Sequence, residues 1–113
     1  IVNGTALAFN LTAEIDYERG YPVTFNHAGQ TDFVTSAVRS AFSKDAIDTE
    51  VPPTMGSEDF SFMLEERPGA YIMMGNGDSA GVHHPAYEFN DAAIPVGVTY
   101  WASLVEMAMP RHA

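Results

Sequence analysis

Two adjacent histidines, His83 and His84, are the residues best suited to chemistry in this sequence, and they lie in the segment SAGVHHPAYEFND at 79–91. An imidazole can bind a metal ion or carry a proton near neutral pH. Pro85 disfavours a helical conformation at the residue before it, so His84 is expected to be extended. In an extended chain neighbouring side chains point to opposite faces. We therefore expect at most one of the two histidines to face a site.

A metal site needs more ligands than this pair provides. A catalytic zinc ion takes about three protein ligands and keeps one open position. The sequence has no HExxH pattern and no cysteine, and its other histidines, His27 and His112, are isolated. By spacing alone, an ordinary loop or terminal position without a ligand role is the favoured interpretation for each histidine.

The segment MGSEDF, residues 55–60, is the second candidate site. Gly56 and Ser57 precede a predicted helix, where free backbone N–H groups can bind a carboxylate or an oxyanion. Helix capping explains the same residues, because Ser57 is a favoured N-cap. Glu58 and Asp59 also suit the positive end of the helix dipole. Both interpretations stay open on the residues alone.

Helices and strands alternate in the predicted secondary structure. The spacing of apolar residues, with caps and proline stops, predicts helices at 1–9, 31–44, 57–66 and 94–109. Alternating or short apolar runs predict strands at 12–18, 49–51 and 70–74. This order favours an α/β fold in which a helix covers a sheet. The expected core-facing stripes of the two long helices are Phe33, Val34, Ala37, Val38, Ala41 and Phe42, and Val98, Trp101, Val105 and Met109.

The composition argues against two classes of partner. Fifteen Asp and Glu against five Lys and Arg give a net charge of −10, which repels phosphate backbones and anionic lipids. No apolar run approaches the roughly 20 residues that span a bilayer. We therefore expect no nucleic acid and no membrane among the partners, and a cytoplasmic protein. The chain opens with Ile1 rather than Met, and we expect it to be a fragment of a longer protein.

Three segments occur together in a distinctive order: RGYPVTFN at 19–26, MGSEDFSFMLEERPGAYIMMGNG at 55–77, and VHHPAYEFNDAAIPVGVTYWASLV at 82–105. In this combination the chain closely resembles the C-terminal part of the M20 metallopeptidase family. The similarity is to its amidohydrolase branch, the hippurate hydrolases and N-acyl-amino-acid amidohydrolases. The resemblance covers nearly the whole chain, and it depends on the joint order and spacing of the three blocks.

The resemblance implies a two-domain architecture. Family members have a three-layer α/β/α zinc-peptidase-like catalytic domain, and a ferredoxin-like βαββαβ lid is inserted in it. By this likeness, residues 1–26 are the last helix and strand of the lid, and residues 27–113 are the C-terminal part of the catalytic domain. The lid often mediates dimers, so the resemblance implies that the complete protein is a homodimer.

The resemblance also implies a function. The family hydrolyses amide bonds with a water activated by two divalent ions, commonly zinc or manganese. Its last metal ligand is a histidine in an LH-x-P context, which VHHP matches at His83. The block Gly56, Ser57, Glu58 and Asp59 resembles the loop beside the metals and implies contact with a small N-acyl amino acid or peptide substrate.

The chain departs from the family pattern in a way that limits this function. The other ligands, in an HACGHD-like block and a pair of glutamates, and the general-base glutamate have no counterpart here. We therefore expect no catalytic residue in this chain, an incomplete metal site and no activity of the chain by itself. The alternative function is a non-catalytic interaction or dimerisation module that retains part of the fold.

Overall fold

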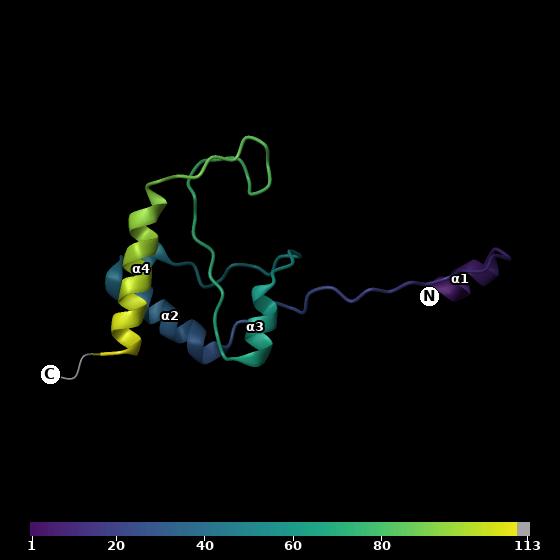
Figure 1. Cartoon of the computed structure of the whole chain (residues 1–113), viewed down its shortest axis with the longest axis horizontal. Coiled ribbons are helices and arrows are strands. Elements are labelled where there is room, and N and C mark those ends of the chain that lie inside the picture. The colour runs from purple at the N-terminus through teal and green to yellow at the C-terminus, as the bar shows by residue number, and fades with distance from the viewer. Residues whose placement is uncertain (111–113) are drawn as a thin grey trace.

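The structure, a computed structural model, describes residues 1–110. It consists of helices joined by long extended segments, and no strand forms within the described residues (Figure 1). No helix in this part of the chain is long and apolar enough to cross a membrane. The elements in chain order are α1 (Val2–Ala8), α2 (Ala28–Ala41), the 3-10 helix η1 (Lys44–Ala46), α3 (Phe60–Glu66) and α4 (Ala93–Ala108).

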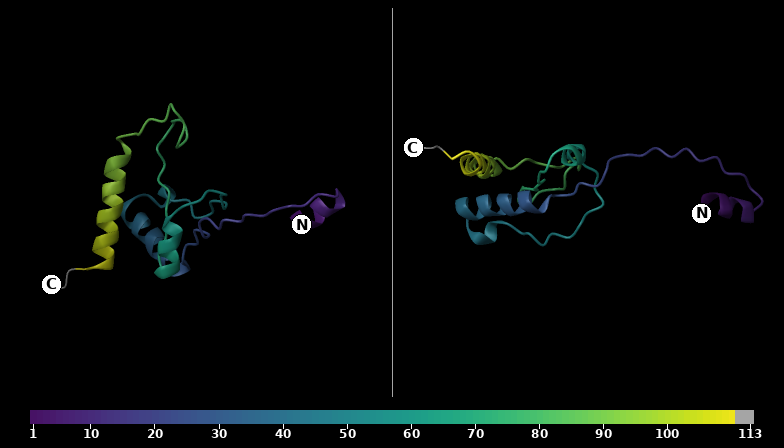
Figure 2. Two further views of the ribbon diagram at one scale, coloured as in Figure 1. Left: turned by 45° about the vertical axis from the view of Figure 1, so that its right-hand side comes forward. Right: turned by 90° about the horizontal axis from the view of Figure 1, so that it is seen from below.

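The chain is far more open than a compact domain of its size. Its accessible surface is 9891 Å², whereas a compact monomer of this mass exposes about 6100 Å². Its radius of gyration is 20.6 Å, against about 13 Å for a compact domain of this length. Much of the difference comes from α1 and the extended segment 11–25, which lead away from the remaining helices (Figures 1 and 2).

A small core lies where α4 crosses α2. Val34 and Val38 of α2 are buried against Tyr100 of α4, and Ala37 between them has no exposed surface. Burial in this contact raises the pKa of Tyr100. The half-buried residues Phe42, Ile47, Ala70 and Leu104 surround the contact.

The predictions for the first three helices are largely confirmed. α1 matches the predicted helix at 1–9, and the stripe predicted for α2 is the face that packs on α4. α2 begins at Ala28 rather than Thr31, because the extended His27 accepts the backbone hydrogen bond from Thr31 and starts the helix early. α3 ends at Glu66 and leaves Pro68 and Gly69 outside, as their sequence predicts.

The position of α4 agrees with its prediction, but the predicted core face is wrong. The helix begins at Ala93, so Pro95 stands at the third helical position, where its missing N–H has no intrahelical partner to lose. Val98 and Trp101 of the predicted stripe are 63% and 62% exposed. Ala93, Gly97, Tyr100 and Leu104 form a second stripe with equally good helical spacing. Within it Tyr100 and Leu104 pack on α2, and Gly97 lies beside Met74. Periodicity alone gives no preference between the two stripes.

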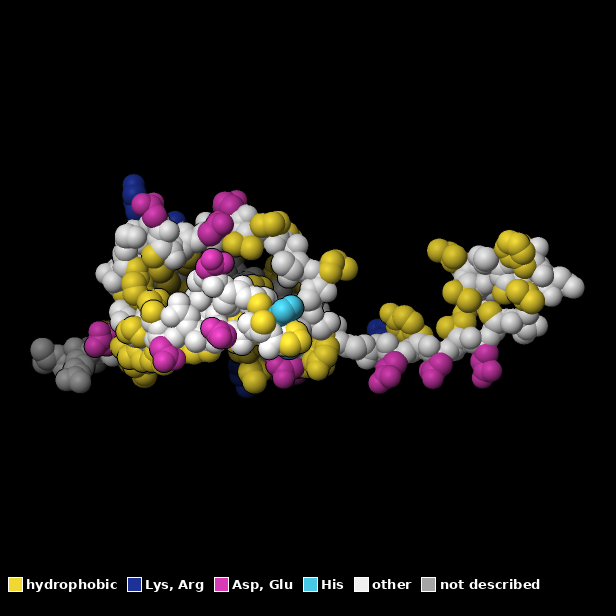
Figure 3. All heavy atoms as spheres, turned by 90° about the horizontal axis from the view of Figure 1, so that it is seen from above, with side chains coloured by type: hydrophobic (Ala, Val, Ile, Leu, Met, Phe, Trp, Pro, Cys, Tyr) yellow, Lys and Arg dark blue, Asp and Glu magenta, His cyan; other side chains and the backbone are white. Residues whose placement is uncertain are grey.

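None of the three predicted strands forms within the described residues, so these predictions are not confirmed. Segments 12–18, 49–51 and 70–74 form no β-ladder, because a strand requires a neighbouring strand for its backbone groups and these segments have none. The predicted buried face of the first strand is also absent, since Ile15 and Tyr17 are 53% and 79% exposed. The sheet of the expected α/β arrangement, including the last strand of a lid, is therefore not formed within residues 1–110. Figure 3 shows acidic side chains standing along the extended segment that leads to α1.

Candidate functional site

The histidine loop, residues 76–91, is closed at its base by one asparagine. The side-chain oxygen of Asn76 accepts a hydrogen bond from the backbone N–H of Asn90 at 2.8 Å. Its amide nitrogen donates to the carbonyl of Glu88 at 2.7 Å and to the hydroxyl of Ser79 at 3.0 Å. Gly77 has a positive φ of 82°, which favours glycine, and an added Cβ would lie 3.2 Å from the amide of Asn90. These contacts fix both ends of the loop.

The two histidines have different environments in this loop. His83 is exposed and has a φ of 73°, in the left-handed region that residues other than glycine rarely adopt. The backbone of His84 closes two successive turns, donating to Gly81 at 3.0 Å and accepting from Tyr87 at 2.9 Å. Nδ1 of His84 accepts a hydrogen bond from the N–H of Ala86 at 3.1 Å. His84 therefore has a structural partner within the loop, whereas His83 is presented to solvent.

The residues 56–59 do not cap α3 in the predicted way. Gly56, Ser57 and Asp59 are exposed, and the helix begins at Phe60 with Asp59 at the N-cap position and no side-chain capping bond. Ser57 as N-cap is therefore wrong. The reason is local: Oε1 of Glu58 accepts the N–H of Phe60 at 3.3 Å, and the carbonyl of Glu58 accepts the hydroxyl of Ser61 at 2.6 Å.

Glu58 is the best defined side chain of this segment. The backbone hydrogen bond from Phe60, and then the hydroxyl of Tyr71 donating to Oε2 at 3.1 Å, hold the pKa of Glu58 below its ordinary value. The same contact raises the pKa of Tyr71, because the phenol can donate this hydrogen bond only while it is protonated, and its anion would lie beside a carboxylate. The contact thus favours the anionic form of Glu58 and the protonated form of Tyr71.

Tyr71 and the residues that hold it were not predicted from the sequence. Asn26 binds the backbone of Tyr71 at both its N–H and its carbonyl, at 2.7 and 2.8 Å. His27 makes a similar pair with Gly69: its N–H donates to the carbonyl at 3.0 Å, and its Nδ1 accepts the N–H at 3.2 Å. The backbone N–H and Nδ1 of His27 are therefore both bonded to the backbone of Gly69. The signal in the sequence was a polar hydroxyl on Tyr71 within the apolar run AYIMM.

The described residues do not form a metal centre by themselves. Within residues 1–110 no group of three or more His, Cys, Asp or Glu side chains is gathered in a way that could hold an ion. The donor set therefore does not fit a complete catalytic site, which takes about three protein ligands. His83 could supply one ligand to a shared site, and the predicted non-ligand His112 lies outside the described residues.

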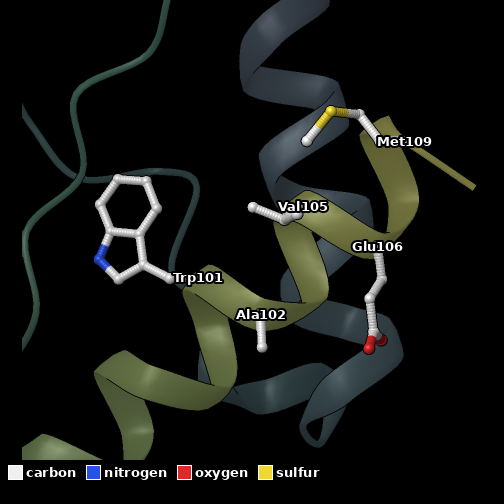
Figure 4. Close-up of a pocket in the computed structure, with 5 residues that line it drawn as sticks. All are labelled: Trp101, Ala102, Val105, Glu106 and Met109. Carbon is white, nitrogen blue, oxygen red and sulfur yellow. The ribbon is translucent and has the colours of Figure 1, made fainter.

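Two surface hollows add no catalytic group to this picture. One, of about 640 Å³, is lined by Trp101, Ala102, Val105, Glu106 and Met109, and Figure 4 shows these residues along α4 and at its C-terminal end. Side chains from one helix make an open surface beside that helix and not an enclosed cleft. The other, of about 300 Å³, lies at the base of the histidine loop between Asn76 and Asp91. Neither hollow is lined by His83 or by residues 56–59.

Comparison with known proteins identifies the class. Residues 3–107 match the model of peptidase family M20/M25/M40, and the chain belongs to this family. It is 32% identical to a probable hydrolase of Synechocystis sp., over 92% of this chain and 30% of that protein. It is 30% identical to the hippurate hydrolase of Campylobacter jejuni, over 92% of this chain and 27% of that protein. It is 32% identical to the N-acetyldiaminopimelate deacetylase of a Geobacillus species, over 93% of this chain and 27% of that protein.

These relatives define how much of the family is present. The chain spans less than a third of the length of the curated relatives it matches. Membership implies an α/β peptidase fold for the complete family domain, and the family generally uses divalent metal ions. No solved structure matches this chain.

Proposed function

We propose that this chain is the C-terminal segment of a metal-dependent amidohydrolase that acts on N-acyl amino acids of the hippurate type or on small peptides. The observation that carries the proposal is the family match over residues 3–107 together with relatives named as a hippurate hydrolase and deacetylases. The open shape and the unpaired extended segments support the view that other parts of the domain normally cover these residues.

The proposal gives a place to each segment. Residues 1–26 would belong to the end of the lid, and residues 27–113 to the catalytic domain. The change from the isolated α1 and its extended connection to the packed α2–α4 region supports a boundary near His27. A homodimer, a cytoplasmic location and the absence of nucleic-acid partners stay predictions.

In this proposal His83 is one ligand of a centre with two divalent ions, zinc or manganese, and residues 56–59 contact the substrate. The exposure of His83 at a turn with a left-handed backbone supports its ligand role, because unusual backbone angles concentrate at functional sites. Gly56 and Ser57 are exposed next to the fixed carboxylate of Glu58, which supports their use in contacting a polar ligand.

The test uses the full-length protein that contains this chain. Hydrolysis of hippurate and N-acetyl amino acids is measured with bound metal, before and after chelation, in the wild type, His83→Ala and His84→Ala. We expect His83→Ala to lose both metal and activity, and His84→Ala, the matched control, to retain the metal. Unchanged metal content and rates in His83→Ala would remove His83 from the metal centre.

A non-catalytic interaction or dimerisation module is the second candidate. The observation that favours it is the absence of a metal-binding group within residues 1–110, together with the exposed apolar face of α4. Metal analysis of the purified 113-residue chain tests the incomplete-site premise that both candidates share. We expect weak, substoichiometric zinc, and a tightly bound equivalent would contradict an incomplete site.

A further inference from the structure

Asn26 holds a segment distant in the sequence by satisfying both polar groups of one residue. Its Oδ1 accepts the N–H of Tyr71 at 2.7 Å, and its Nδ2 donates to the carbonyl of Tyr71 at 2.8 Å. A side-chain amide thus takes the place of the neighbouring strand that residues 70–74 lack. His27 and Gly69 exchange a second pair of hydrogen bonds directly beside it.

The segment that Asn26 holds extends to the candidate substrate loop. The hydroxyl of Tyr71 donates to Oε2 of Glu58 at 3.1 Å, and its ring lies 5.7 Å from the ring of Phe60, between centroids. Oε1 of Glu58 in turn accepts the N–H of Phe60 at the start of α3. A continuous set of contacts therefore runs from Asn26 through Tyr71 to Glu58.

We propose that Asn26 is a positioning residue: it acts through Tyr71 to fix the carboxylate of Glu58 beside Gly56 and Ser57. This inference rests on the proposed function for the part these residues play with substrate. The bond from the phenol to Glu58 depends on where the backbone of Tyr71 lies, and Asn26 binds that backbone at two points. The N–H and the carbonyl of Tyr71 belong to two successive peptide units, so this two-point contact restrains both of them, which a single hydrogen bond does not.

The inference is tested first by tyrosine and glutamate titration. In the 113-residue chain labelled with ¹³C-tyrosine and ¹³C-glutamate, NMR should show the pKa of Tyr71 raised and that of Glu58 lowered. In Asn26→Ala we expect both to move toward their ordinary values. Asn26→Asp keeps the acceptor for the N–H of Tyr71 and loses the donor to its carbonyl, so it should give smaller shifts in the same direction.

Two controls separate positioning from general loss of structure. The pKa of Tyr100 is raised by burial between α2 and α4, and it should stay raised in Asn26→Ala. Asn76→Ala removes a comparable pair of asparagine hydrogen bonds from the histidine loop and should leave the pKa of Tyr71 unchanged. The inference would be overturned if the pKa values of Tyr71 and Glu58 in Asn26→Ala stay as they are in the wild type. It would also be overturned if the pKa of Tyr100 returns to its ordinary value together with that of Tyr71.

A kinetic measurement in the full-length protein separates this inference from the proposed function. We expect Asn26→Ala and Tyr71→Phe to lower kcat/KM for an N-acyl amino acid by similar factors. The double variant should be no worse than either single variant, because both remove the same contact path. Independent, multiplying losses would overturn the inference. Absence of hydrolysis by the wild type would refute the proposed function, and the titration would still decide the role of Asn26.

Discussion

The hydroxyl of Tyr71 donates a hydrogen bond of 3.1 Å to Oε2 of Glu58, across 13 residues of sequence. The contact joins the apolar segment that follows α3 to the segment that precedes α3, and it stabilises the carboxylate form of Glu58. The pKa of Glu58 is lowered and that of Tyr71 is raised, so each residue reports on the other.

The first prediction concerns the pH dependence of this pair. Folding lowers the pKa of this carboxyl group, so its ionised form stabilises the protein at pH values above its ordinary pKa of about 4.5. This stabilisation is lost as the pH falls through the lowered pKa. Tyr71→Phe should therefore reduce the free energy of unfolding more at pH 7 than at pH 3, as measured by urea titration. Tyr17→Phe, at an exposed position, is the control. An equal loss at both pH values would contradict the linkage.

The second prediction concerns the contact of α2 with α4. Ala37 has no exposed surface there, so Ala37→Leu overfills the contact and should destabilise the chain by about 1–3 kcal/mol. Ser36→Leu places the same side chain on the exposed face of α2 and should change stability by less than about 0.5 kcal/mol. Chemical denaturation followed by circular dichroism measures both. Equal effects would mean that the two helices do not pack in this way.

The third prediction concerns the exposed face of α4. Val98, Trp101 and Val105 leave a contiguous apolar stripe in water, so the purified chain should self-associate and bind a hydrophobic dye. Trp101→Lys should reduce both effects in sedimentation and fluorescence measurements. Thr99→Lys adds the same charge at an exposed polar position of α4 and should have a much smaller effect. A monodisperse monomer that unfolds cooperatively would contradict the expectation.

The fourth prediction separates backbone strain from ligand binding at His83. Glycine adopts a φ of 73° without the steric penalty of a side chain, which is about 1–2 kcal/mol. The greater freedom of glycine in the unfolded chain offsets part of this gain. The free energy of unfolding of the His83→Gly variant should therefore exceed that of the His83→Ala variant by about 1 kcal/mol. In the full-length protein both variants should lose the metal equally, and metal retention in either would contradict the ligand role.

Local pattern was sufficient for the helices and insufficient for the strands. Val34, Ala37 and Val38 repeat at helical spacing, and the backbone hydrogen bonds of a helix are made within the helix itself. The apolar run at 70–74 has the composition of a strand, but its hydrogen bonds need a partner that residues 1–110 do not offer. A propensity for strand is thus not enough to form one.

The sequence indicated the segments of the candidate site better than their contacts. The VHHP block indicated His83, and the structure shows that His83 is exposed while His84 accepts a hydrogen bond from Ala86 within the same loop. The partners Asn26 and Tyr71 were missed because 45 residues separate them, and no local pattern reports such a contact. On α4 two equally spaced stripes competed, and only the tertiary contact of Tyr100 distinguishes them.

The extended segment 11–25 has a consequence for digestion by proteases. A protease binds its substrate as an exposed, extended strand, and Arg19 lies exposed in the middle of this segment. Of the other basic residues within 1–110, Arg39 lies within α2 and Lys44 within η1, while Arg67 is followed by proline. Within residues 1–110, brief trypsin treatment should therefore cleave after Arg19 first and release α1, leaving a product that starts at Gly20 and keeps the contact of α2 with α4.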